Sequence, residues 1–166
     1  MSTDAIVLLK EDHKQIRKLF RDSEEAGPNA TKTKGKIVGK IIEALTVHTY
    51  IENEGMYPAV RDLLPTVEED VLESYEEHHV ADVLCMELAA MSADHERFDA
   101  KTTVLIESVT HHIEEEEQEW FPQVREALSR TQLQELGQRM LDLRKKAPHS
   151  PAQPGALKKV ADAILA

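Results

Sequence analysis

Apolar residues recur at intervals of three and four along most of the chain, a spacing that places them on one face of a helix. No segment shows the alternation expected of a half-buried β-strand. The pattern predicts four long helices, over residues 4–25, 31–56, 66–91 and 100–128. Four helices of similar length joined by short loops predict an all-α protein, an antiparallel up-down four-helix bundle.

Prolines and polar residues indicate where these helices end. We expect Pro58 to end or kink the second helix, and Pro122 likewise lies near the end of the fourth. Thr66 and Glu69 have the spacing of a capping box, which predicts that the third helix begins at Thr66.

The chain changes character after residue 128, and we expect additional short C-terminal helices there. The first of them begins with a Thr131-x-x-Gln134 motif. We therefore divide the chain into a bundle over residues 1–128 and a helical extension over residues 129–166. In order, the extension contains a short amphipathic helix over residues 131–146, a Pro-rich linker over 147–155 and a last short helix over 156–166.

The charge of the chain limits its partners. Its 31 acidic and 20 basic residues give a net charge of -11, which argues against binding to nucleic acid or to an anionic membrane. No apolar run is long enough to span a membrane, and the N-terminus lacks the basic and apolar blocks of a signal peptide. We expect a cytoplasmic protein in which the single cysteine, Cys85, is a buried, reduced thiol.

A 21-residue segment occurs twice, over residues 41–61 and 105–125. Overlaying the two copies without a gap pairs His48 with His112 and pairs Glu52 with Glu116. Residues four apart share a helix face, so each copy aims an imidazole and a carboxylate at one point. Two such helices facing each other predict a metal site and favour one with two metals. In each copy an aromatic-Pro pair follows the glutamate, Tyr57-Pro58 in the first and Phe121-Pro122 in the second.

A looser match relates residues 11–13 to residues 76–78, where a histidine follows two acids in each case. Apolar residues three and six positions later place both histidines on the core-facing stripe of their helices. A buried cluster of imidazoles and carboxylates is costly without a compensating cation, and imidazole suits iron, zinc and copper. The four helices then supply six candidate metal ligands: His13, His48, Glu52, His78, His112 and Glu116.

Other readings apply to individual residues. Any of the six candidates is a solvated or core side chain if it does not face the others. His79, His95 and His111 are better interpreted as exposed or as hydrogen-bond partners of ligands, because His79 and His111 lie about 100° around the helix from their neighbours. The acidic run over residues 114–117 is a solvated face, apart from Glu116.

Over about residues 8–128, these motifs resemble the hemerythrin family, in particular its bacterial hemerythrin-like HHE branch. The aromatic-Pro pair after each H-x-x-x-E is typical of that branch. The resemblance implies a bundle that encloses a non-haem centre of two iron ions (Fe²⁺/Fe³⁺) with an oxo or hydroxo bridge. It also implies that Glu52 and Glu116 both bridge, and that the histidine ligands are His13, His48, His78 and His112.

The sequence departs from the oxygen-carrying hemerythrins, which have H-x-x-x-H on the third helix and an aspartate on the fourth. Here the positions four residues from His78 are Ser74 and Asp82, so one imidazole is missing. One iron then has an open position, or another group fills it. Tyr75 lies three residues before His78 and is a candidate extra ligand or a hydrogen-bond partner of one; the alternative is a core aromatic.

The resemblance, with the missing histidine, favours reactivity over stable O₂ storage. We expect a protein that binds or reacts with O₂ or peroxide, and also NO, through catalase-like decomposition of hydrogen peroxide or defence against oxidative and nitrosative stress. The alternative is a module that senses O₂ or iron and signals through its C-terminal extension. A third alternative is a ferritin-like oxidase, which needs E-x-x-H on two helices. Only Glu76 and His79 fit that motif and no second copy exists, which argues against it.

Overall fold

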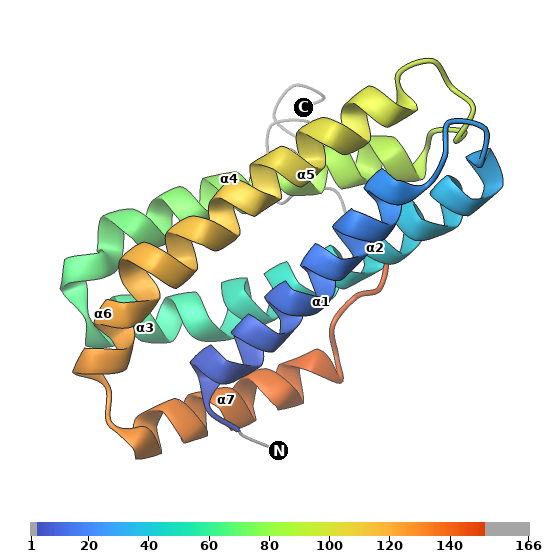
Figure 1. Cartoon of the computed structure of the whole chain (residues 1–166). Helices are drawn as coiled ribbons and strands as arrows, with labels where there is room; N and C mark the ends of the chain where they lie inside the picture. Colours follow the sequence, from blue (N-terminus) through green and yellow to red (C-terminus); the bar gives the residue numbers. More distant parts are fainter. Residues whose placement is uncertain (1–2, 152–166) are drawn as a thin grey trace, which may run out of the picture.

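A computed structural model of the protein describes residues 3–151, which form helices and short connections (Figure 1). None of these helices has the length and apolar character needed to cross a membrane. In chain order they are α1 (Ala5–Glu25), α2 (Thr31–Ile51), α3 (Tyr57–Leu63), α4 (Glu68–Ala89), α5 (Phe98–Glu115), α6 (Phe121–Ala127) and α7 (Arg130–Arg144).

The helices confirm the predicted all-α bundle. α1 packs on α2 and α4 packs on α5, while α2 also contacts α4 and α1 contacts α5. α3 and α6 extend α2 and α5, so that four long helical rods run antiparallel (Figure 1). α7 lies against α1 and α2 on the outside of the bundle (Figure 1).

The two rods that carry the repeated segment each contain a π turn, a helical turn with one extra residue. The first π turn spans Glu52–Met56 and the second spans Glu116–Trp120. In each, the amide after the turn donates to the carbonyl five residues earlier: Tyr57 to Glu52, and Phe121 to Glu116. A proline follows directly in both rods. Widening the helix there removes the clash that a proline ring makes with the carbonyl four residues before it.

Pro58 therefore does not end its helix, which is perturbed by the π turn instead, and the fourth helix continues past Pro122 as predicted. Each proline lies in the first turn of the helix that follows the π turn, and the rods continue to Leu63 and Ala127. A proline in a first turn lacks only an amide that needs no partner there. The sequence indicated correctly that the helix is perturbed near Pro58. It could not show that a π turn accommodates the proline and lets the helix continue.

Two predicted helix starts are also corrected. Thr66 and Glu69 do not form a capping box, because residues 65–67 make a 3₁₀ turn and α4 begins at Glu68 without a side-chain cap. α7 begins at Arg130 rather than at Thr131, with a capping box made by Ser129 and Gln132. The predicted last helix over residues 156–166, and residues 152–155 of the predicted linker, lie outside the described residues.

The apolar core consists of two clusters, with a layer of buried polar side chains between them. On α1, Leu9 belongs to one cluster and Ile16 to the other, and His13 lies between them. On α2 the same order appears with Ile51, Leu45 and, between them, His48. The helical periodicity that builds the core therefore also points the polar residues inward.

Asp4 caps α1 and ties it to the end of the fourth rod. Its Oδ1 accepts hydrogen bonds from the amides of Ile6 and Val7, at 3.0 and 3.1 Å, and Arg125 pairs with the same carboxylate. Burial opposes the charge on Asp4, but Arg125 and the two amides outweigh it and lower the pKa of Asp4 below its ordinary 3.8. This carboxylate therefore stabilises the fold in its ionised form.

We predict that Asp4→Ala lowers the free energy of unfolding of the metal-free protein by about 2 kcal/mol, and that Asp4→Asn, which keeps a capping side chain, lowers it by less. Because folding lowers the pKa of Asp4, the stability it adds is fully present above pH 4 or so and disappears as the pH falls through the folded value. Urea unfolding followed by circular dichroism at a series of pH values measures both effects. A difference between wild type and Asp4→Asn that does not shrink in acid would contradict this assignment.

Candidate metal centre

The structure brings all six predicted ligand side chains into one buried cluster in the polar layer of the bundle. Their donor atoms form two groups, and the atoms of each group lie within 4.8 Å of one another. We call His13 and His48 the first pair and His78 and His112 the second pair; Glu52 and Glu116 belong to both groups. One carboxylate and one histidine come from each rod that carries the repeat, and α1 and α4 each supply one histidine.

The Nε2 atoms of the four histidines face one another across the two carboxylates. They are 3.2 Å apart within the first pair and 3.0 Å apart within the second. Glu52 presents Oε1 to His48 at 3.3 Å and Oε2 to His78 at 3.1 Å. Glu116 presents Oε2 to His13 at 3.2 Å and Oε1 to His112 at 3.4 Å. Each carboxylate therefore turns one oxygen toward each pair.

The outer nitrogen of every cluster histidine has a hydrogen-bond acceptor. With Nδ1 donating to that acceptor, the neutral imidazole leaves the lone pair of Nε2 directed into the cluster, as metal binding requires. The Nδ1 contacts are His13 to Glu117 at 2.8 Å, His48 to Asp12 at 3.2 Å, His78 to Asn53 at 2.7 Å and His112 to Glu77 at 2.7 Å.

These outer acceptors follow the repeats, and the sequence contained a signal for them. Asp12 and Glu77 are the acids that directly precede the histidines of α1 and α4. Asn53 and Glu117 directly follow the two cluster glutamates and align with each other when the 21-residue segments are overlaid. Sequence reasoning recognised both patterns but did not assign them to holding the imidazoles.

Tyr57 is a cluster residue that the sequence analysis missed. It is fully buried, and its hydroxyl lies 2.5 Å from Glu116 Oε1, 3.2 Å from Glu52 Oε2 and 3.1 Å from His78 Nε2. On a regular helix a residue five positions after Glu52 points about 140° away from it. The first π turn takes up this difference and returns Tyr57 to the face of Glu52.

Tyr75, the tyrosine singled out from the sequence, does not reach the cluster. Its hydroxyl donates to the backbone carbonyl of Asn53 at 3.4 Å, and its ring packs edge-on against Tyr57 with centroids 5.1 Å apart. Tyr75 therefore lies behind Tyr57. Its position three residues before His78 puts it near the right helix face, but Tyr57 occupies the space in between.

Phe121 occupies the corresponding place in the second repeat. Its ring stacks on His13, with centroids 6.0 Å apart and an interplanar angle of 10°. Tyr57 stacks in a similar way on His78, at 5.2 Å and 24°. The repeat thus places an aromatic ring beside each histidine pair, but only the second pair receives a hydroxyl.

Burial and mutual charge separate the pKa values of the two shared carboxyls. Burial, followed by the charge of Glu116, raises the pKa of Glu52 well above its ordinary value. Burial acts on Glu116 in the same direction, but His112 and His13 outweigh it and hold the pKa of Glu116 well below its ordinary value. Of the two carboxyls, Glu116 is therefore the one whose surroundings favour the ionised form.

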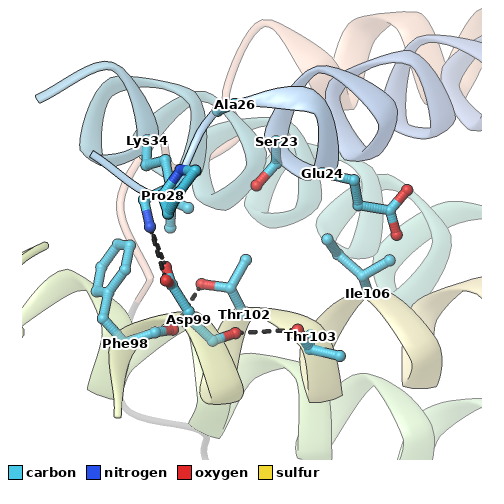
Figure 2. Close-up of a pocket in the computed structure, with 11 residues that line it drawn as sticks. Ser23, Glu24, Ala26, Pro28, Lys34, Phe98, Asp99, Thr102, Thr103 and Ile106 are labelled. Atoms are coloured by element: carbon cyan, nitrogen blue, oxygen red, sulfur yellow. Dashed lines mark hydrogen bonds and ion pairs between the residues drawn. The ribbon is translucent and has the colours of Figure 1, made fainter. Parts of the chain in front are cut away.

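Little free space remains at the cluster. A cavity of about 10 Å³ adjoins three of its histidines and is otherwise lined mainly by apolar side chains such as Leu45, Ala81 and Val109. That volume is close to the minimum for one water molecule. The larger hollow in Figure 2, about 370 Å³, is elsewhere: it lies at the start of α5, where Lys34 pairs with Asp99. Asp99 precedes His112 by thirteen residues, or about 20 Å along the helix.

His79, His95 and His111 do not join the buried cluster. His95 is exposed, and His79 is half-buried and outside both groups of donor atoms. His111 is exposed and pairs with Glu115 at 2.9 Å. With Glu77 these two residues make a separate group at the surface, among the described residues.

Comparison with known proteins identifies the family. Residues 4–124 match the hemerythrin family, described as the hemerythrin HHE cation binding domain. The chain belongs to this family. The fold is also that of a crystal structure of a hemerythrin HHE cation binding domain-containing protein from Mycobacterium kansasii, with a TM-score of 0.71, 22% sequence identity and 86% of each chain covered.

A curated relative is considerably longer. It is a protein named DNA nickase from Nostoc sp. strain PCC 7120, 27% identical over 128 residues that make up 77% of this chain and 35% of the relative. The matched part of this chain therefore spans about a third of the length of that relative.

The donor atoms of the cluster fit metal ions. Glu52 Oε1 and Glu116 Oε2 are buried and make no hydrogen bond, and both face the first pair. Buried carboxylate oxygens without a partner are costly, and a cation between them and the Nε2 lone pairs removes that cost. Together with the family match, this donor set makes the chain a metal-binding hemerythrin-like protein.

We predict that a divalent metal stabilises the folded chain through these residues. Zn²⁺ binds imidazole and carboxylate without redox chemistry, and at about 100 times its dissociation constant a ligand adds about 2.7 kcal/mol to the free energy of unfolding. Differential scanning calorimetry of the metal-free protein with and without Zn²⁺ measures the shift. His48→Ala is expected to remove most of it, whereas the exposed His95→Ala is expected to leave it intact. Equal shifts in the two variants would show that Zn²⁺ binds elsewhere.

Proposed function

We propose that the protein is a non-haem di-iron protein that decomposes hydrogen peroxide and so defends the cell against oxidative stress. The observation that carries the proposal is the arrangement of Glu52 and Glu116, each of which offers one oxygen to each histidine pair. His13 and His48 would hold one ion, His78 and His112 the other, and the two carboxylates both. Two iron ions cycling between ferrous and ferric states supply the electron transfer by which two molecules of peroxide become two of water and one of O₂.

The replacement of the fifth histidine of the oxygen carriers supports reactivity rather than storage. Ser74 stands four residues before His78, and its small, buried side chain leaves room for the phenol of Tyr57 next to His78. The hydroxyl of Tyr57 thus lies 3.1 Å from His78 Nε2. This favours proton transfer at the second pair.

Tyr57 is placed to hold a proton for the reaction. Its hydroxyl donates to Glu116 Oε1 and also lies within hydrogen-bond distance of Glu52 Oε2. Peroxide decomposition moves protons from one peroxide to the oxygen atoms of another. Burial and the charges of Glu116 and Glu52 raise the pKa of Tyr57 well above its ordinary value, so the phenol keeps its proton until bound metal lowers the negative charge around it.

The size of the site supports a very small substrate. The free cavity next to the histidines has room for about one water-sized molecule, and its lining is almost entirely apolar. Peroxide, O₂ and NO are small enough to enter after minor side-chain movement. Larger organic substrates would require the helices to separate.

A second candidate function is a sensor of O₂ or iron, and one contact favours it. Arg144 of α7 donates to Asp12, the residue that holds His48, so that the extension touches the surroundings of the centre. The nickase activity of the longer Nostoc protein is not extended to this chain, because a net charge of -11 opposes binding to DNA.

The proposal is tested by measuring metal content and peroxide turnover together. The protein, loaded with Fe²⁺ under anaerobic conditions, is expected to hold close to two irons per chain by mass spectrometry and to release O₂ steadily from hydrogen peroxide at an oxygen electrode. Glu52→Ala is expected to lose both properties, and His95→Ala to keep both. Two bound irons without O₂ release would favour the sensor, and no bound iron would overturn the di-iron assignment.

We further predict that Tyr57→Phe lowers the rate of peroxide decomposition about 100-fold, the usual scale for removing a proton-transfer group, while iron content is retained. Tyr75→Phe is the matched control, since its hydroxyl reaches only a backbone carbonyl, and it is expected to turn over at the wild-type rate. Any visible absorption band from a phenolate on iron should be absent from Tyr57→Phe and present in Tyr75→Phe. Equal turnover in the two variants would remove Tyr57 from the mechanism.

A further inference from the structure

α7 lies beyond the residues that match the hemerythrin family, yet it is built into the same core. Leu133, Leu136 and Met140 are fully buried in the apolar cluster that also contains residues of α1. At Gly137 the backbone of α7 approaches so closely that a Cβ atom would lie 1.6 Å from the carbonyl oxygen of Thr3. This fixes the position of α7 against the start of the bundle.

α7 also packs on the first π turn, which begins with Glu52. A Cβ atom on Gly55 would lie 3.0 Å from Leu143 and 3.1 Å from Met140, so the absence of a side chain at Gly55 permits the contact. The turn that carries a shared carboxylate is therefore covered by α7.

At the end of α7, Arg144 reaches the surroundings of the first pair. Its guanidinium donates to Asp12 Oδ2 at 2.8 Å, and the same oxygen accepts from His48 Nδ1 at 3.2 Å. Asp12 thus stands between an arginine of the extension and an imidazole of the cluster. An arginine bound to a carboxylate restricts its rotation and keeps it ionised.

The second pair has no equivalent. His112 is held by Glu77 and His78 by the neutral amide of Asn53, and neither Glu77 nor Asn53 pairs with an arginine or lysine within residues 3–151. In the first pair, by contrast, Arg17 binds Glu117, the partner of His13. Arginine support is therefore confined to the first pair, and for His48 it comes from α7.

We propose that Arg144 is a positioning residue of the metal centre: through Asp12 it fixes the imidazole of His48, and so makes α7 part of the first metal position. This inference rests on the proposed two-metal centre. It gives α7, which lies outside the matched residues 4–124, a role at one of the two metal positions. Substituting the hydrogen-bond partner of a ligand histidine lowers metal affinity about 10- to 100-fold. Loss of Arg144 is expected to act on the first position and to spare the second.

The test is a titration of the metal-free full chain with Co²⁺, whose visible absorption follows occupancy, in wild type, Arg144→Met and Arg144→Lys. Arg139→Met is the control, because Arg139 is an exposed arginine of the same helix. Arg144 and Asp12 line a hollow at the surface, and Arg144 is only part-buried, so the substitution leaves the packed face of α7 unchanged. Circular dichroism checks that helix content is the same in all variants.

We expect wild type and Arg139→Met to bind two Co²⁺ with the same two dissociation constants. In Arg144→Met one constant should rise about 10-fold or more while the other stays unchanged, and Arg144→Lys should restore part of the loss. Asp12→Asn should weaken the same position, and adding Arg144→Met to it should cause no further loss, because Arg144 acts through Asp12.

The outcomes separate this inference from the proposed function. Two unchanged constants in Arg144→Met would overturn the role of Arg144 and leave the centre standing. An equal loss at both positions would indicate a general effect on folding and would also overturn it. A wild-type chain that binds no Co²⁺ would overturn the two-metal centre, and the inference with it.

Discussion

The structure depends on the burial of four imidazoles and two carboxylates in one layer between two apolar clusters. Such a layer is costly unless every polar atom has a partner, and the surrounding residues are arranged to supply those partners. A carboxylate or an amide accepts a hydrogen bond from each outer imidazole nitrogen. The hydroxyl of Tyr57 lies within hydrogen-bond distance of the two carboxylate oxygens that face the second pair. The oxygens left without a hydrogen bond, Glu52 Oε1 and Glu116 Oε2, mark where the chain alone does not complete the layer.

The two π turns connect this layer to the backbone. Each begins at a shared carboxylate and precedes a proline, so the widening that accommodates the ring also changes the helical phase after the carboxylate. As a result, the residue before each proline faces the cluster rather than the far side of the helix. A feature that reads in the sequence as a helix end is in fact what places Tyr57 and Phe121 beside the histidines.

The sequence was sufficient to predict the bundle, because the helices follow from a fixed helical period. It was also sufficient to predict the six cluster residues, because the internal repeat selects one histidine and one glutamate in each copy and the same period places the other two histidines on the core-facing side. It was insufficient for Tyr57, because a constant 100° per residue fails across a π turn and turns Tyr57 away from Glu52. The capping box at Thr66 failed for a different reason: a local spacing cannot show that residues 65–67 form a 3₁₀ turn. The packing of α7 depended on close contact at Gly137, which a helical pattern does not reveal.

The repeat makes the two histidine pairs similar in geometry, and the differences between its copies make them unlike in chemistry. Tyr57 corresponds to Phe121, so a hydroxyl stands at the second pair and only a hydrocarbon ring at the first. Asn53 corresponds to Glu117, so a neutral amide and a carboxylate hold equivalent imidazoles. Arginines add to the same difference. The two carboxylates that hold an imidazole and also bind an arginine, Asp12 and Glu117, both hold histidines of the first pair. The repeat thus places two histidine pairs in one buried layer while giving one pair a hydroxyl and the other charged support. Under the proposed two-metal function, this difference would let a reaction treat its two metals differently.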